Sequence, residues 1–250
     1  MKCNIFVGIL LLAVGLSGCV TESTGGMPAP AAADERISAQ LDLARGYIEQ
    51  RNFSRAKVPL ERALEIDPAH VEARVLNAVL LQSENEFELA EDNYKAALRA
   101  DGRDPQALNN YGSFLYSRER YEEAVEVLRK LVGDTSYRAR SQAFENLGLA
   151  LLKTAEAEQA EGAFTRALEL NFRQPRSNLE LADLAFQAGN YTEAASQLLS
   201  FRTYARQTPR SLCLSYKVAR ARGDQDQASS NLLALTNLFP QQAQECQAKI

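Results

Sequence analysis

Few side chains in this 250-residue chain could do chemistry. It has four cysteines, Cys3, Cys19, Cys213 and Cys246, and one histidine, His70. A zinc-protease helix needs two histidines, and a Ser-His-Asp arrangement would have to use His70, which falls in an expected surface loop. Two thiols without a nearby histidine make a poor zinc site, and no glycine-rich phosphate-binding motif is present. We therefore expect a protein that is not an enzyme and that takes no metal, cofactor or small-molecule substrate.

Cys19 stands at the end of a targeting segment. Lys2 supplies a positive charge, residues 5–16 form the apolar run "IFVGILLLAVGL", and two small residues follow. The run is too short for a stable transmembrane helix and is typical of a signal peptide. With the cysteine it resembles the bacterial lipobox, in which the thiol is acylated and the chain is cut before the cysteine. This resemblance implies a signal peptide over residues 1–18 and a lipid anchor at Cys19; the alternative is an ordinary signal with an incidental cysteine.

The residues after Cys19 predict where the protein is held. In the lipoproteins that this segment resembles, Asp in the next position favours the inner membrane, so Val20 implies the outer membrane and its periplasmic face. Residues 19–36 are rich in Gly, Pro, Ser, Thr and Ala, and they have no helical periodicity before Ile37. We expect a flexible tether there, anchored by more than one acyl chain.

The charge of the chain argues against polyanionic partners. Removing residues 1–18 removes Lys2, which leaves 27 basic against 32 acidic residues and a net charge of −5. An acidic balance gives no reason to expect nucleic acid or anionic headgroups as ligands. Tryptophan is absent and Ala, Leu and Glu are frequent, which is typical of an all-helical chain.

A repeat runs through the rest of the chain. Its marker alanines are Ala56, Ala90, Ala124, Ala160, Ala194 and Ala228, at spacings of 34, 34, 36, 34 and 34 residues. A period of 34 residues is the length of the tetratricopeptide repeat (TPR), in which two antiparallel helices, A and B, form one unit. The expected fold is therefore an all-α, right-handed TPR superhelix. The extra two residues fall in "VGDTSYRA", between the third and fourth repeats.

The repeat register predicts the domain boundaries. Six repeats cover residues 37–240, with helix pairs in the ranges 37–70, 71–104, 105–138, 141–174, 175–208 and 209–242. The sixth repeat is degenerate, with Ser215, Tyr216 and Gln225 at the expected Leu, small and aromatic positions. Residues 241–250 would form a short capping helix.

A non-enzymatic TPR array binds a protein segment along its helix A face. The residues expected on this face are Leu41, Arg45, Ile48, Val75, Val79, Asn109, Tyr116, Asn146, Leu149 and Lys153. The first two repeats supply an apolar stripe and the third is polar. The alternative for each apolar residue is packing against a neighbouring helix.

Together, the lipobox, the short tether, the six repeats and the C-terminal cysteine pair resemble the type IV pilus biogenesis lipoproteins of the PilF/PilW pilotin family. The resemblance implies an anchored protein that binds secretin subunits and promotes their localisation and multimerisation at the outer membrane. The alternative partner is another envelope machine, for β-barrel insertion or cell-wall synthesis. An unrecognised hydrolase is the remaining alternative, and the single histidine argues against it.

Cys213 and Cys246 are the thiols left once Cys3 is cleaved off and Cys19 is acylated. They fall in helix A of the sixth repeat and in the following helix, which are neighbours in a TPR stack. Because the periplasm is oxidising, we expect a disulfide between them. The alternative is two separately buried thiols.

Overall fold

The computed structural model describes residues 30–248 and, within them, thirteen helices and no strand. The helices are α1 (Pro30–Glu49), α2 (Phe53–Ile66), α3 (Val71–Ser83), α4 (Phe87–Ala100), α5 (Pro105–Ser117), α6 (Tyr121–Val132), α7 (Arg140–Lys153), α8 (Ala157–Leu170), α9 (Pro175–Gln187), α10 (Tyr191–Tyr204), α11 (Pro209–Ala221), α12 (Gln225–Leu238) and α13 (Pro240–Ala248). The all-α repeat architecture expected from the sequence is confirmed.

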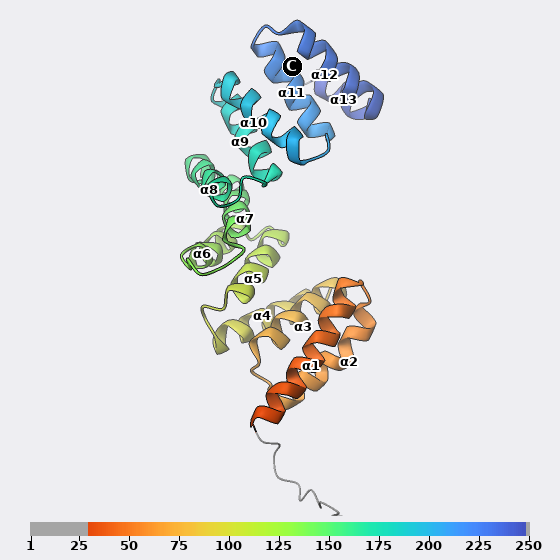
Figure 1. Ribbon diagram of the computed structural model, residues 1–250, viewed down its shortest axis with the longest axis vertical. Helices are drawn as coiled ribbons and strands as arrows, with labels where there is room; N and C mark the ends of the chain where they lie inside the picture. The colour runs from red at the N-terminus through yellow and green to blue at the C-terminus, as the bar shows by residue number, and fades with distance from the viewer. Residues whose placement is uncertain (1–29, 249–250) are drawn as a thin grey trace, which may run out of the picture.

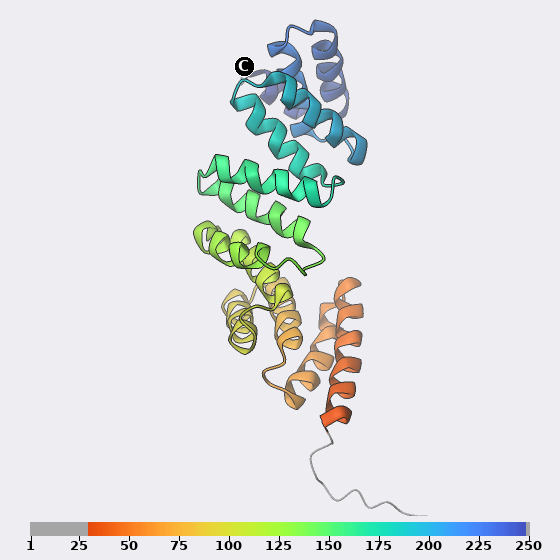
Figure 2. The ribbon, with the colours of Figure 1, turned by 60° about the vertical axis from the view of Figure 1, so that its left-hand side comes forward.

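Twelve of the helices form six consecutive pairs, from α1–α2 to α11–α12. Figures 1 and 2 show the pairs stacked along the long axis, with α1 and α2 at one end and α11 to α13 at the other. Odd-numbered helices from α1 to α11 are the A helices of the repeats, and even-numbered helices are the B helices. The last helix, α13, packs against α11 and α12.

Helix α1 is longer than the sequence predicted. It begins at Pro30 rather than at Ile37, so residues 30–36, expected in the tether, are helical. The reason is local: proline is favoured in the first turn of a helix, and the alanines that follow it are the best helix formers. A composition rich in Ala and Pro was therefore a misleading signal of a flexible segment. The rest of the expected tether lies outside the described residues.

The marker alanines are buried in the core between the packed helices. All six are at most 3% exposed. Glycine serves the same purpose on helix A of the third and fourth repeats. A Cβ built on Gly112 would lie 2.7 Å from Leu128, and one built on Gly148 would lie 2.7 Å from the Phe164 ring. The small residues of the repeat therefore permit a close approach that any larger side chain would prevent.

The turn from helix A to helix B also repeats through the chain. Each turn has one residue in the left-handed region, with φ between 56° and 79°. These residues are Arg51, Asn85, Glu119, Ala155, Gly189 and Gly223. Only the last two are glycine, so the first four turns hold a side chain in a conformation that costs about 1 kcal/mol. The packed helices on either side determine these turns.

The insertion between the third and fourth repeats forms the loop from Gly133 to Ala139. Its exit is held by Arg140, whose Nε donates a hydrogen bond to the carbonyl oxygen of Val132 at 2.9 Å. One buried apolar cluster continues across this junction from Val75 to Leu181. The insertion lengthens the loop without interrupting the core of the second to fourth repeats.

Candidate functional site

A groove of about 350 Å³ lies between the helices of the first three repeats. Val79 and Gln82 line it from α3, and Asn110 and Ser113 line it from α5. Phe53, Ser83, Tyr94 and Phe114 complete the lining. Val79 and Ser113 occupy the same position in consecutive repeats, so the groove follows the helix A face. An apolar surface with a few amide and hydroxyl groups is what a protein segment can bind.

Three aromatic rings in mutual contact support the floor of this groove. The ring of Tyr94 on α4 lies 5.4 Å from that of Phe114 and 5.7 Å from that of Tyr111, both on α5. The Tyr94 hydroxyl donates a hydrogen bond to Oε1 of Gln82 at 3.3 Å, which orients that amide at the groove. Burial raises the pKa of Tyr94, so its hydroxyl stays protonated as a donor.

Two of the residues expected on the binding face do not present their side chains there. Leu41 is 3% exposed and Val75 is 2% exposed, and both belong to the apolar core. We correct the expectation for these two residues: they pack against neighbouring helices, the alternative that the pattern left open. Val79 is half-buried at the edge of the same core and lines the groove.

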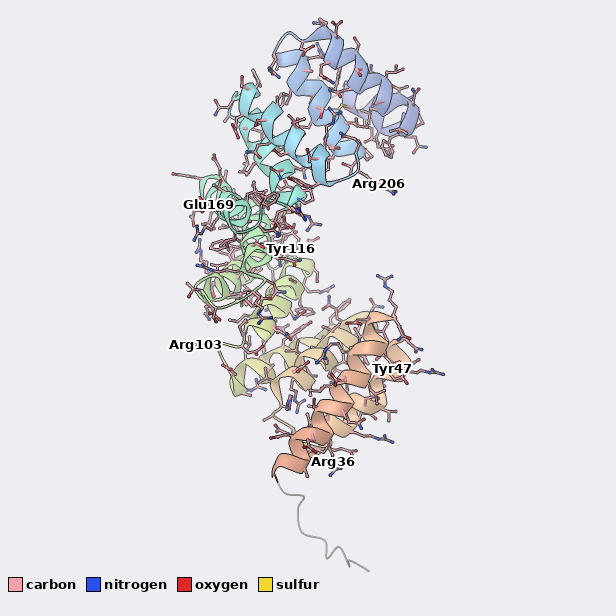
Figure 3. The ribbon with its side chains drawn as sticks, in the orientation of Figure 1. Arg36, Tyr47, Arg103, Tyr116, Glu169 and Arg206 are labelled. Atoms are coloured by element: carbon pink, nitrogen blue, oxygen red, sulfur yellow. A yellow bond between two sulfur atoms is a disulfide. The ribbon has the colours of Figure 1, made fainter. Side chains whose placement is uncertain are left out.

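Other expected residues come together at the junction of the third and fourth repeats. The Asn146 side chain on α7 donates a hydrogen bond to Oδ1 of Asn109 on α5 at 3.2 Å. The ring of Tyr116, labelled in Figure 3, meets that of Tyr121 edge-to-face at 5.4 Å. Lys153 holds its ammonium 5.8 Å from the same Tyr121 ring. The structure thus groups these residues into a second polar and aromatic patch.

The remaining expected residues are more closely tied to the fold. Arg45 forms ion pairs with Asp42, at 2.9 Å, and with Glu72 of the next repeat. Ile48 is half-buried against the core of the first repeat, and Leu149 is half-buried against that of the middle repeats. Each can offer only part of its side chain to a partner.

Sequence reasoning missed two polar contacts that join helix A residues of consecutive later repeats. Arg210 on α11 donates to both carboxylate oxygens of Glu180 on α9, at 2.5 and 2.7 Å, and to Asp183 at 2.8 Å. These hydrogen bonds, Glu180 first, raise the pKa of Arg210. One repeat earlier, the Ser177 hydroxyl donates to Oε2 of Glu145 at 2.8 Å. The sequence did carry a signal for the ion pair, because Glu180 and Arg210 place opposite charges on the A helices of consecutive repeats.

The lone histidine has a structural position. His70 is the N-cap of α3, and its Nδ1 accepts a hydrogen bond from the backbone N–H of Ala73 at 3.3 Å. Side-chain acceptors at this position satisfy a backbone donor that has no partner within the helix. Among residues 30–248, no group of three or more His, Cys, Asp or Glu side chains is arranged to hold a metal ion.

The two C-terminal cysteines lie close together. The Cα atoms of Cys213 on α11 and Cys246 on α13 are 5.8 Å apart, and their sulfur atoms are within bonding distance. This geometry is compatible with the expected disulfide. Cys19 and the lipobox expected there lie outside the described residues. None of the described helices is long and apolar enough to cross a bilayer.

Comparisons with known proteins agree with this architecture. The tetratricopeptide repeat family model matches residues 76–142 and 145–209. The chain is 42% identical to the type IV pilus assembly protein PilF of Pseudomonas aeruginosa over 233 residues, which cover 93% of this chain and 92% of the relative.

Solved structures extend the similarity to three dimensions. A structure of P. aeruginosa PilF, 41% identical, superposes with a TM-score of 0.83 and covers 88% of this chain and 100% of its own. The crystal structure of PilW, a widely conserved type IV pilus biogenesis factor, is 25% identical, with a TM-score of 0.73 and coverage of 84% and 97%. The chain belongs to the PilF/PilW family of tetratricopeptide-repeat proteins of type IV pilus biogenesis.

Proposed function

We propose that this protein is a pilotin: a lipid-anchored scaffold that binds secretin subunits and promotes their localisation and multimerisation at the outer membrane. The observation that carries the proposal is similarity to a type IV pilus assembly protein over 93% of the chain. The groove between α3 and α5 supplies a surface that suits a protein segment. In this proposal the protein catalyses no reaction.

The anchor and the groove have separate roles. Acylation of Cys19 holds the protein at the outer membrane, and Val20 directs the sorting. The groove holds the secretin subunit, with Val79 as its apolar contact and Gln82, Asn110 and Ser113 as polar contacts. The Asn109–Asn146 pair and Tyr116 extend the surface toward the fourth repeat.

The anchor is tested by Cys19→Ser, which removes the acylated thiol. We expect the variant to leave the outer-membrane fraction and to leave secretin made but poorly assembled. Val20→Asp is the matched sorting variant, expected to keep its lipid and move to the inner membrane. A Cys19→Ser protein that still fractionates with the outer membrane would contradict the anchor.

The groove is tested by Val79→Asp in the full chain, with binding measured against purified secretin subunits. Val58 is the matched control, because it is 49% exposed on α2 and does not line the groove. We expect Val79→Asp to weaken binding by about tenfold or more and Val58→Asp to leave it unchanged. Circular dichroism must show both variants folded.

The alternative, an adaptor for another envelope machine, predicts a different result. The protein would still need its anchor, but purified secretin subunits would not bind the wild-type chain. The two experiments therefore separate the anchor from the partner. Failure of secretin binding would overturn the pilotin proposal without affecting the family assignment.

A further inference from the structure

The junction between the fifth and sixth repeats lacks a large side chain that the three preceding junctions have. In the third, fourth and fifth repeats the seventh residue of the range is a large aromatic or aliphatic side chain buried in a core shared with the preceding repeat. Tyr111 is this residue in the third repeat, where its ring lies 5.7 Å from Tyr94 on α4. Leu147 and Leu181, the equivalent residues of the fourth and fifth repeats, are buried in the core shared with the preceding repeats.

The equivalent residue of the sixth repeat is Ser215, which is too small to fill this space. A pocket of about 170 Å³ remains between α10, α11 and α12. Its apolar lining includes Leu198 and Val218, which are 4% and 2% exposed. Cavities of about 150 Å³ hold a benzene-sized apolar group, so the pocket can take one aliphatic side chain.

The Ser215 hydroxyl is buried beside this pocket, turned away from its open space, and has no hydrogen-bond partner among the described residues. Ser215 is 9% exposed, so solvent access does not compensate it. The second repeat also has a polar residue at this seventh position, but there Asn77 has a partner, because it donates a hydrogen bond to Oδ1 of Asn93 at 3.2 Å. An unpartnered buried hydroxyl lowers the stability of a protein core. A ligand that accepts a hydrogen bond from it removes this penalty and thereby gains affinity.

The polar groups around the pocket are mainly donors. Asn231 uses its Oδ1 to accept from Gln227, which leaves its N–H groups available. Arg202 and Arg222 line the pocket, and within residues 30–248 neither is within ion-pair distance of a carboxylate. One carboxylate, Asp224, is also present, and it already accepts from the backbone N–H of Gln227 at 3.0 Å.

We propose that this pocket binds the free C-terminus of a polypeptide whose last residue is aliphatic. The side chain would fill the space that Leu147 and Leu181 fill at the preceding junctions. The carboxylate would accept from an arginine and from the Ser215 hydroxyl, which reaches the pocket by rotation about its Cα–Cβ bond. A terminal residue presents both groups on a single Cα, which matches an apolar floor beneath a donor-rich rim. The pocket is separate from the groove between α3 and α5, so this inference does not rest on secretin binding.

The test uses the full chain with labelled alanine methyl groups, because Ala195 and Ala219 line the pocket and report on it directly. The probe is N-acetyl-leucine, and N-acetyl-leucine amide is its matched control. We expect saturable shifts of both methyl signals with the acid, at a dissociation constant of about 1 mM, and binding of the amide about tenfold weaker.

Two substitutions at Ser215 separate binding from folding. Ser215→Leu restores the side chain of the preceding repeats, so it should raise the melting temperature and abolish binding of the acid. Ser215→Ala leaves the space open and removes the unpartnered hydroxyl, so it should bind the acid several-fold more weakly without a lower melting temperature. If Ser215→Leu does not fold, Ser215→Ala alone still decides the role of the hydroxyl.

The charge is tested by changing Arg202 and Arg222 to Gln together, which should weaken binding by about tenfold. Arg99, exposed on α4 and outside the pocket, is the control and should have no effect when changed to Gln. Equal binding of acid and amide, no saturable shift, or unchanged binding by the Ser215 variants would each overturn the proposal.

Discussion

Tyr111 on α5 donates a hydrogen bond from its hydroxyl to Oε1 of Glu91 on α4, at 3.0 Å, and thereby joins the second repeat to the third. The other oxygen of the same carboxylate, Oε2, accepts from Arg120 at 2.7 Å, and the Lys95 ammonium lies 2.7 Å from Oε1. These hydrogen bonds, that of Arg120 first, lower the pKa of Glu91 to about 2. Burial raises the pKa of Tyr111 to about 12.

The lowered pKa predicts a loss of stability in acid. The unfolded carboxyl, with a pKa near 4.5, binds a proton before the folded one. The stabilisation by Glu91 is therefore complete above about pH 5 and is lost as the pH falls toward 2. Glu91→Gln should lower the free energy of unfolding at neutral pH and flatten its dependence between those limits. Urea unfolding at several pH values measures this, and Asp92→Asn, exposed in the interior of the same helix, should match the wild type.

Two glycines predict opposite effects of the same substitution. Gly148→Ala would place a Cβ 2.7 Å from the buried ring of Phe164, so we expect a loss of about 1–3 kcal/mol from overpacking. Gly162 lies inside α8 with nothing within 4 Å of its Cβ position. Gly162→Ala should therefore stabilise the protein by about 0.5–1 kcal/mol through helix propensity. Equal effects of the two changes in thermal unfolding would contradict the packing argument.

Breaking the ion pair between Arg210 and Glu180 should cost more stability than breaking an exposed ion pair. The Glu180 side chain is 9% exposed, so Arg210→Ala would leave a nearly buried carboxylate without its two hydrogen bonds. We expect a loss of about 1–3 kcal/mol in the free energy of unfolding. Arg166→Ala breaks a pair with Glu169 in which both side chains are about half exposed. That control should cost less than about 0.5 kcal/mol, and a similar cost for both would refute the role of burial.

The cysteine pair predicts that the C-terminal end depends on oxidation. A bridge between Cys213 and Cys246, 33 residues apart, would contribute about 3–4 kcal/mol in the chain-entropy model. Thiol counting on denatured, non-reduced protein should find neither sulfur free. Reduction should increase amide exchange in α13 first, because this terminal helix is held mainly by its packing against α11 and α12. Two reactive thiols in addition to any at Cys19 would rule out the bridge.

The helix pairs and their order could be predicted from the sequence, because the 34-residue spacing of the alanines reflects a contact that every repeat must make. The exposure of single residues could not. Periodicity identified a helix face containing Leu41, Val75 and Val79, but a neighbouring helix covers the first two and leaves the third beside the groove. Which part of a face is covered depends on the angle between helices, and no local pattern encodes it.

The start of α1 and the role of Ser215 likewise could not be predicted from the sequence alone. The composition of residues 30–36 predicted a flexible tether, whereas the structure continues α1 through them. The sequence by itself determined the repeat fold and the degenerate position of Ser215, and it predicts the lipid anchor at Cys19. Only the tertiary structure decided that Ser215 leaves a pocket and that Arg210 meets Glu180, because both depend on the distance between side chains of different repeats, and packing determines that distance.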